Sequence, residues 1–197
     1  MRIFFLACYL FISAVFLAGC SDSADGITET TLIVARDGGV SEAIIEDFDK
    51  DYYLRSDLES FIDQRINEFN ASGSEGKKVS LDRLTVENRK ALAVVDFDSI
   101  ETYADFSGNE AFFGTISEAY DAGYSFDVTL KSTTESETIG KEEIMEMDDK
   151  HILVISEPIS VRSSRRILYA SANVDVKDTN NVSVSSESVG LAYMILK

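Results

Sequence analysis

Four residue types that build many catalytic and structural sites are scarce in this chain of 197 residues. It has two cysteines, one histidine, one proline and no tryptophan. Cys8 and Cys20 both lie in the first twenty residues, so the remainder can form no disulfide, no cysteine nucleophile and no thiolate metal site. The single histidine, His151, excludes most histidine metal sites and hydrolase triads. Without tryptophan, a sugar-binding platform of large aromatic rings is disfavoured.

The first twenty residues have the layout of a secretory signal peptide. Arg2 precedes a predominantly apolar run, Ile3–Leu17, which small residues and Cys20 follow. A run of about 15 residues is too short to span a bilayer, which needs about 20, so a retained transmembrane helix is disfavoured. The ending Leu17-Ala18-Gly19-Cys20 resembles the lipobox of bacterial lipoproteins. That resemblance implies cleavage before Cys20 and lipidation of its thiol by a diacylglyceryl group.

This interpretation divides the chain into three parts. Residues 1–19 are a lipoprotein signal peptide, residues 20–26 are the lipidated cysteine with a short polar tether, and residues 27–197 form one domain. No repeat and no linker rich in proline, glycine or serine interrupts the third part. Two acyl chains at Cys20 suffice for stable attachment. We therefore expect an extracytoplasmic protein anchored to the outer face of the cell membrane.

The charge is strongly acidic. The chain has 35 acidic and 18 basic residues and a net charge of −17, and removal of residues 1–19 would take away one base, Arg2. Such a surface repels nucleic acid and anionic lipid headgroups, so we expect no nucleic-acid partner and attachment through the lipid alone. The charge serves either solubility or the capture of cations or a basic partner, and solubility is the simpler interpretation.

Hydrophobic periodicity predicts an α+β domain. Apolar or alternating runs predict strands at Thr30–Arg36, Val40–Phe48, Lys77–Val86, Lys90–Phe97, Tyr124–Lys131, Ile152–Ile155, Arg166–Val176 and Val189–Leu196. Helices are predicted after a capping box at Ser56–Glu59, after Ser99, and from Asn109 through Tyr120. The first helix has an apolar stripe of Leu58, Phe61, Ile62, Ile66 and Phe69. We expect a mostly antiparallel sheet of about seven or eight strands with two or three helices on one face.

A second resemblance covers roughly the first fifty residues after the cut. The run Asp37-Gly38-Gly39-Val40, the segment Ile44–Tyr53 and the helix Leu58–Asn70 look like a group of uncharacterised lipoproteins of Gram-positive bacteria. The group brings no activity, ligand or site residues. It implies a Gram-positive cell envelope, with the domain between the bilayer and the wall.

The spacing of Asp47, Asp49 and Asp51 is that of the first ligands of a calcium loop. An EF-hand also needs glycine at the sixth position and glutamate at the twelfth, where this chain has Tyr52 and Leu58. The segment therefore fails as an EF-hand. Either the aspartates form a looser calcium site or they face water, and the second alternative is the more common for such residues.

Three further clusters have a structural and a functional interpretation. Tyr52-Tyr53 can line a ligand surface or close the edge of a core. Asp96 and Asp98, at the end of a strand, can act as a hydrolytic acid and base or simply begin a helix. The one basic cluster can pair with an anionic wall polymer, pair with an acidic patch of the same fold, or form a solvated hairpin tip. It consists of Arg162, Arg165 and Arg166.

No sequence motif for phosphate, dinucleotide or serine-hydrolase chemistry occurs. The sequence therefore favours a non-catalytic module that binds a protein or a small molecule and needs no cofactor. A carboxylate-dependent hydrolase of the cell envelope, with or without calcium, is the alternative. A structural envelope protein without a specific ligand is the third interpretation.

Overall fold

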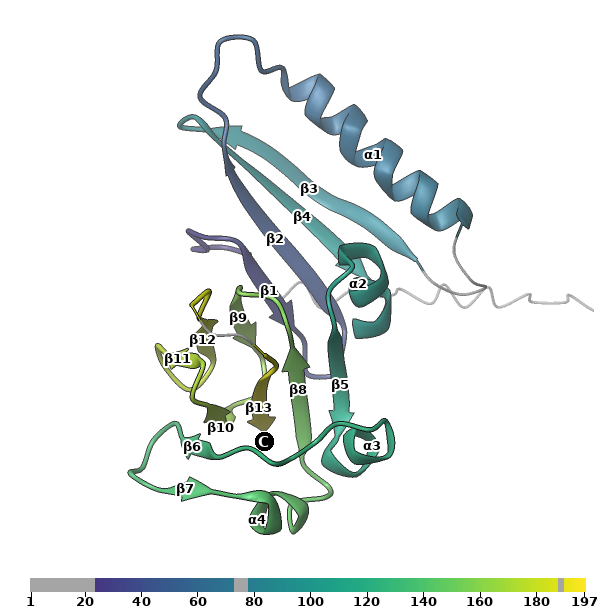
Figure 1. Ribbon diagram of the computed structural model, residues 1–197. Helices are drawn as coiled ribbons and strands as arrows, with labels where there is room; N and C mark the ends of the chain where they lie inside the picture. Colours follow the sequence, from purple (N-terminus) through teal and green to yellow (C-terminus); the bar gives the residue numbers. More distant parts are fainter. Residues whose placement is uncertain (1–23, 73–77, 188–189) are drawn as a thin grey trace, which may run out of the picture.

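The computed structural model of this chain describes residues 24–72, 78–187 and 190–197 (Figure 1). The predicted signal peptide and the predicted lipidation site, Cys20, lie outside these residues. The described part is an α+β structure with two sheets and four helices. The predicted fold class is confirmed, but the predicted number of strands was too low. Instead of one sheet of seven or eight strands there are two, of seven and six strands.

The larger sheet contains seven strands, and most neighbours in it are antiparallel. From edge to edge they are β11 (Val174–Val176), β12 (Asn181–Val184), β9 (Ser160–Ser163), β1 (Thr31–Val34), β2 (Val40–Asp47), β4 (Lys90–Phe97) and β3 (Val79–Glu87). The exception is the β1–β9 pair, which is parallel and places Thr31 opposite Ser160. Strands β1 and β2, both predicted from the sequence, form an antiparallel hairpin in which Val34 is paired with Val40.

The smaller sheet is antiparallel throughout. Its order is β5 (Ala111–Thr115), β8 (His151–Ile155), β13 (Ala192–Leu196), β10 (Ile167–Ser171), β6 (Leu130–Ser132) and β7 (Thr138–Ile139). All five residues of β13 are buried. Its uninterrupted apolar sequence follows from this position, because both faces of the strand are covered.

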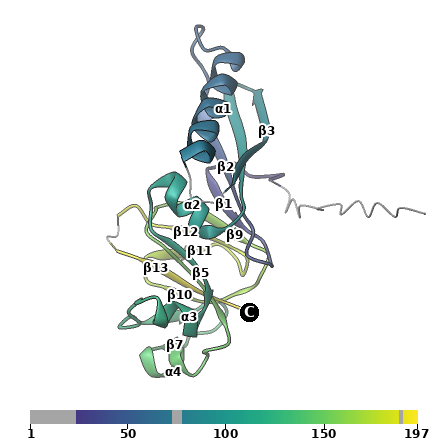
Figure 2. The same cartoon turned by 90° about the vertical axis from the view of Figure 1, so that its right-hand side faces the viewer.

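The helices cover different faces (Figures 1 and 2). The first, α1 (Arg55–Ser72), packs on β3, and α2 (Ile100–Ser107) joins β4 to β5. On the far side of the smaller sheet lie α3 (Ile116–Asp121) and α4 (Lys141–Met145). The structure therefore has layers, with one core between the two sheets and a second core beneath α3 and α4.

The outer face of the larger sheet has a small third cluster. Ala24 is buried there against Ile33, Ala43 and Val94, and Ile27 packs beside them. Asp25 also reaches this face and pairs with Arg83 at 3.6 Å. The N-terminal strap, which we define as residues 24–30, therefore includes residues that the sequence assigned to the tether.

The helix predicted from Asn109 to Tyr120 is wrong in its first half. Residues 111–115 form β5, and α3 begins only at Ile116. The true helix start is a capping box in which Thr115 and Glu118 bond each other's backbone N–H. The run that looked helical instead pairs with β8, so tertiary contacts override the local periodicity.

Other boundaries differ for similar reasons. Strands β9 and β12 both fall outside the predicted strands, β12 lying between the predicted strands Arg166–Val176 and Val189–Leu196. The segment Tyr124–Lys131 alternates in burial as expected, yet only its last two residues pair within the sheet. The helix after Ser99 is confirmed, with the Ser99 hydroxyl accepting the backbone N–H of Thr102.

Candidate functional site

The connection between β2 and α1 shapes one end of the molecule. The ladder of β2 ends where the backbone N–H of Phe48 bonds to the carbonyl of Arg89 at 2.7 Å. A turn follows, closed by the N–H of Tyr53 and the carbonyl of Lys50 at 3.0 Å. The carbonyl of Leu54 then accepts the first helical bond of α1. The helix thus begins one residue before Ser56, and leucine occupies the capping position.

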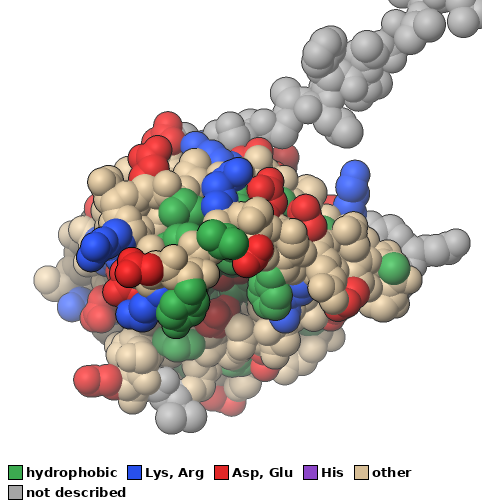
Figure 3. All heavy atoms as spheres, turned by 90° about the horizontal axis from the view of Figure 1, so that it is seen from above, with side chains coloured by type: hydrophobic (Ala, Val, Ile, Leu, Met, Phe, Trp, Pro, Cys, Tyr) green, Lys and Arg blue, Asp and Glu red, His purple; other side chains and the backbone are tan. Residues whose placement is uncertain are grey.

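A groove with a volume of about 440 Å³ lies between this connection and the first turns of α1. We call it the aromatic groove, and its lining residues are Glu46, Asp47, Phe48, Tyr52, Tyr53, Leu54, Asp57, Leu58, Phe61 and Ala91. Figure 3 views the molecule from this end, and hydrophobic side chains gather near the middle of the face among charged ones.

The apolar side chains of the aromatic groove are unusually exposed. Tyr52 is 74% exposed, Phe61 63%, Leu54 56% and Tyr53 40%. These four are the majority of the six large hydrophobic residues that are exposed in the described chain. Tyr53 holds the cluster together, since its ring lies 5.1 Å from that of Phe48 and 5.0 Å from that of Tyr52. A contiguous apolar surface of this kind is typical of a binding site.

The three aspartates of the predicted calcium site are exposed, and one of them, Asp47, lines the aromatic groove. Asp47 pairs with Lys90 at 3.1 Å, and Asp49 pairs with Lys50 at 2.9 Å. Within residues 24–72, 78–187 and 190–197, no three or more histidine, cysteine or acidic side chains are grouped so that they could hold a metal ion.

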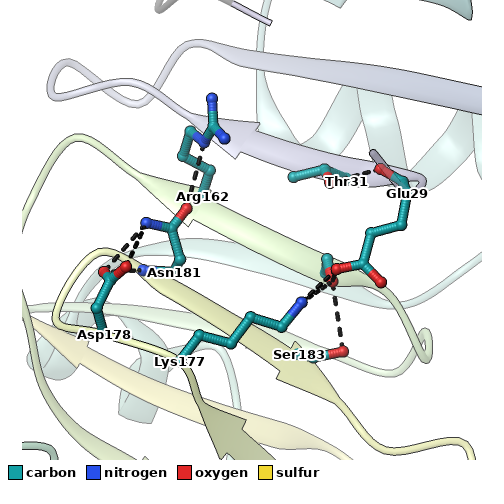
Figure 4. A network of polar contacts seen from close by, with 8 residues as sticks. Glu29, Thr31, Arg162, Lys177, Asp178, Asn181 and Ser183 are labelled. Atoms are coloured by element: carbon teal, nitrogen blue, oxygen red, sulfur yellow. Dashed lines mark hydrogen bonds and ion pairs between the residues drawn. The ribbon is translucent and has the colours of Figure 1, made fainter. Parts of the chain in front are cut away.

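A polar pocket of about 250 Å³ lies where the N-terminal strap meets β9 and β12 (Figure 4). Glu29 accepts hydrogen bonds there from Ser160, at 2.8 Å, and from Lys177. Chiefly because of the Lys177 bond, the pKa of Glu29 lies below its ordinary value. On the other side of the pocket, Arg162 donates to Asn181 at 3.2 Å.

The polar groups of this pocket are satisfied by one another. The amide of Asn181 donates to the carboxylate of Asp178, whose pKa is lowered first of all by a hydrogen bond from the backbone of Asn180. A guanidinium N–H of Arg162 also reaches the carbonyl of Asp25. The arrangement can therefore fasten the N-terminal strap to the sheet, and it offers a ligand few groups that are not already bonded.

The other arginines of the basic cluster also contact the backbone. Arg165 donates to the carbonyl of Arg36 at 2.9 Å and to a main-chain oxygen of Lys197 at 3.1 Å. The backbone carbonyl of Arg166 accepts the N–H of Lys197 at 2.9 Å. The cluster thus joins the β1–β2 turn to the last strand.

Asp96 and Asp98 each have a structural partner. Asp96 accepts a 2.6 Å hydrogen bond from the hydroxyl of Ser41, and Asp98 accepts the backbone N–H of Lys78 at 2.9 Å. His151 lies at the start of β8 with its ring against Phe113. Burial, and next the nearby charge of Arg165, lower the pKa of His151.

The least expected acidic group is Glu42, in the middle of β2. Its register partners are Leu32 and Val95, which both belong to the core between the sheets. Burial, and next the charge of Glu157, raise the pKa of Glu42 to about 7. Glu157 in turn accepts a short hydrogen bond from Tyr103, whose pKa is raised mainly by burial.

Sequence reasoning identified part of this geometry. It singled out Asp47 and the tyrosine pair, which the fold brings into the aromatic groove together with Leu54 and Phe61. It missed Glu42, although the alternation of Val40, Glu42 and Ile44 already placed a carboxylate on an apolar face.

Comparison of the chain with protein-family models, with curated proteins and with solved structures finds no match. None of the helices in the described ranges is long and apolar enough to cross a membrane.

Proposed function

We propose that this protein is a membrane-anchored lipoprotein of the cell envelope whose domain binds a partner without catalysing a reaction. The anchor would be the lipid on Cys20, and the binding surface would be the aromatic groove. The proposal fits an acidic domain that cannot attach to anionic headgroups by charge.

The observation that supports binding most strongly is the exposure of the aromatic groove. Leaving Tyr52, Leu54 and Phe61 in water contributes nothing to folding, because their apolar area stays hydrated. Leucine is also among the poorest residues at a helix capping position. Exposed apolar side chains and a leucine at the capping position both disfavour folding, and such departures are expected where the residues serve a binding site.

The binding surface can be tested by photo-crosslinking in cells. A photoreactive amino acid replaces Phe61 in one variant and Tyr120 in another, since Tyr120 is an exposed aromatic residue on α3 outside the aromatic groove. We expect a discrete crosslinked product from position 61 and none from position 120. Identical products from both positions, or none from either, would contradict the proposal.

The anchor is tested separately by fractionation. The unchanged protein is expected in the membrane fraction, while Cys20→Ala should lack lipid and leave that fraction. A matched Ser21→Ala variant should behave as the unchanged protein does. If the unchanged protein incorporated no labelled fatty acid, or if Cys20→Ala still did, lipidation of Cys20 would be ruled out as the means of attachment.

A carboxylate-dependent hydrolase is a second candidate, favoured by the half-buried carboxyl groups of Glu42 and Glu157, whose charges act on each other. Turnover of a cell-wall polymer that Glu42→Gln or Glu157→Gln abolishes would support it. For calcium, a melting temperature raised by millimolar Ca²⁺ in the unchanged protein, but not in an Asp49→Asn/Asp51→Asn variant, would support a site at Asp47, Asp49 and Asp51.

A further inference from the structure

The aromatic groove lies in the middle of an acidic segment. Residues 46–59 contain two basic residues, Lys50 and Arg55, against six acidic ones. The acidic residues are Glu46, Asp47, Asp49, Asp51, Asp57 and Glu59. Of these, Glu46, Asp47 and Asp57 line the groove itself, and no lysine or arginine does. The apolar floor therefore has an anionic rim.

The basic side chains near the rim are already paired. Lys50 lies 2.9 Å from the carboxylate of Asp49, Arg55 lies 3.3 Å from that of Glu59, and Lys90 lies 3.1 Å from that of Asp47.

The remaining acidic side chains of the segment have no such partner. In the described part of the chain, Glu46, Asp51 and Asp57 form no ion pair. The uncompensated charge at this end is negative, and it attracts cations from solution.

We propose that the aromatic groove binds a cationic amphipathic segment, in which lysine or arginine alternates with apolar side chains. This inference rests on the proposed function and specifies the chemistry of its partner. The apolar side chains would contact Tyr53, Leu54 and Leu58, and the cations would meet Glu46 and Asp57. The faces of exposed rings such as Tyr52 and Phe61 also attract cations.

Charge also decides against the simplest other occupant, a second copy of this chain. Two molecules with a net charge of −17 each would bring two anionic rims together. Like charges in contact across an interface cost several kcal/mol, which disfavours self-association through this face.

The absence of tryptophan from the chain provides a direct assay. The probe is the blocked peptide Lys-Leu-Trp-Lys-Leu-Lys, titrated with the full-length protein in phosphatidylcholine nanodiscs, with empty nanodiscs as the blank. Binding in the aromatic groove should shift the tryptophan emission to shorter wavelength and saturate. The affinity should fall as NaCl is raised. A peptide with glutamate in place of lysine should not bind.

Matched variants locate the site. Phe61→Ala/Asp57→Asn changes the aromatic groove, and Tyr120→Ala/Asp121→Asn makes the same two kinds of change on the exposed surface of α3. We expect the first to weaken peptide binding about tenfold or more and the second to change it less than twofold. Equal effects of the two variants would overturn the proposal.

Two further results would overturn this inference while leaving the proposed function intact. The first is equal binding of the glutamate peptide, which would make the site apolar without charge selectivity. The second is a dimer in sedimentation that Phe61→Ala dissociates, which would identify a second copy as the occupant. Photo-crosslinking at position 61 would still support a binding surface in the first case.

Discussion

Strand β13 and helix α1 are held in the structure to very different degrees. Every residue of β13 is buried, between neighbouring strands and between two apolar layers. Of the 18 residues of α1, only Ile66 is buried. All five side chains of β13 therefore belong to the buried apolar interior, while α1 exposes its side chains along most of its length.

This difference in burial suggests that β13 serves mainly the stability of the fold, whereas α1 is available for binding. Buried apolar area stabilises the fold by about 25 cal/mol per Å². Side chains left exposed on α1 contribute little to stability and are available to a partner. The aromatic groove is lined by the first turns of α1, the less buried of the two elements, where we expect a local opening to cost less free energy than at β13.

The largest expected effect tests this contrast directly. Ile195→Ala in β13 should lower the free energy of unfolding by about 4 kcal/mol, because it leaves a cavity inside the core, where the strand is covered on both faces. Ile66→Ala in α1 should lower the free energy of unfolding by about 2 kcal/mol, because the helix can move closer to the sheet and fill part of the cavity. Denaturant unfolding measures both. Equal losses would show that α1 is held as firmly as β13.

The next effect concerns pH and Glu42. Its pKa is raised to about 7 in the folded protein, so between pH 4.5 and 7 the unfolded chain releases a proton that the folded one keeps. Stability should therefore fall as the pH rises through this range, by about 3 kcal/mol from this group. The stability of the Glu42→Gln variant should depend less on pH, and at pH 8 this variant should be more stable than the unchanged protein.

The matched control for this pH effect is Glu46→Gln, on the same strand and exposed. It removes the same charge and should keep the pH dependence of the unchanged protein. If both variants flattened the curve equally, the net charge of the protein would be responsible and not the burial of Glu42.

A smaller gain in stability is expected at the start of α1. Leu54→Ser places a hydroxyl at the capping position, where it can accept a backbone N–H of the first turn, and should stabilise the protein by about 1 kcal/mol. Leu54→Ala serves as the control and should not. Thermal unfolding distinguishes them. We also expect Leu54→Ser to weaken peptide binding, which would show that stability was sacrificed for recognition.

The smallest effect is expected for Phe61→Ala. This side chain is 63% exposed, so its removal should change the free energy of unfolding by no more than about 0.5 kcal/mol. Chemical denaturation followed by circular dichroism provides the measurement. A loss above about 2 kcal/mol would mean that Phe61 packs as part of the core.

The sequence predicted elements well where local pattern and tertiary environment agree. Strand β4 has the predicted bounds, Lys90–Phe97, because its apolar run is covered as the pattern suggests. The short strands β9 and β12 were missed because polar residues alternate with single valines over only four positions. Such segments become strands through pairing with each other, which no local pattern reports.

The aromatic groove shows the same limit. Phe61 belongs to the apolar stripe of α1 by spacing, and Ile62 and Ile66 of that stripe pack on the core. Phe61 instead faces the solvent. Its exposure depends on which edge of the stripe the sheet covers, and this is a tertiary property. Composition did predict an acidic surface, but the position of its uncompensated part required the fold.

The parallel pairing of β1 with β9 constrains the order of folding. Thr31 lies opposite Ser160, so β1 cannot pair with β9 until that much later part of the chain has been synthesised. The smaller sheet has the same property, since β13 lies between β8 and β10. Neither sheet can close until nearly the whole chain is present, and contacts so distant in sequence form slowly.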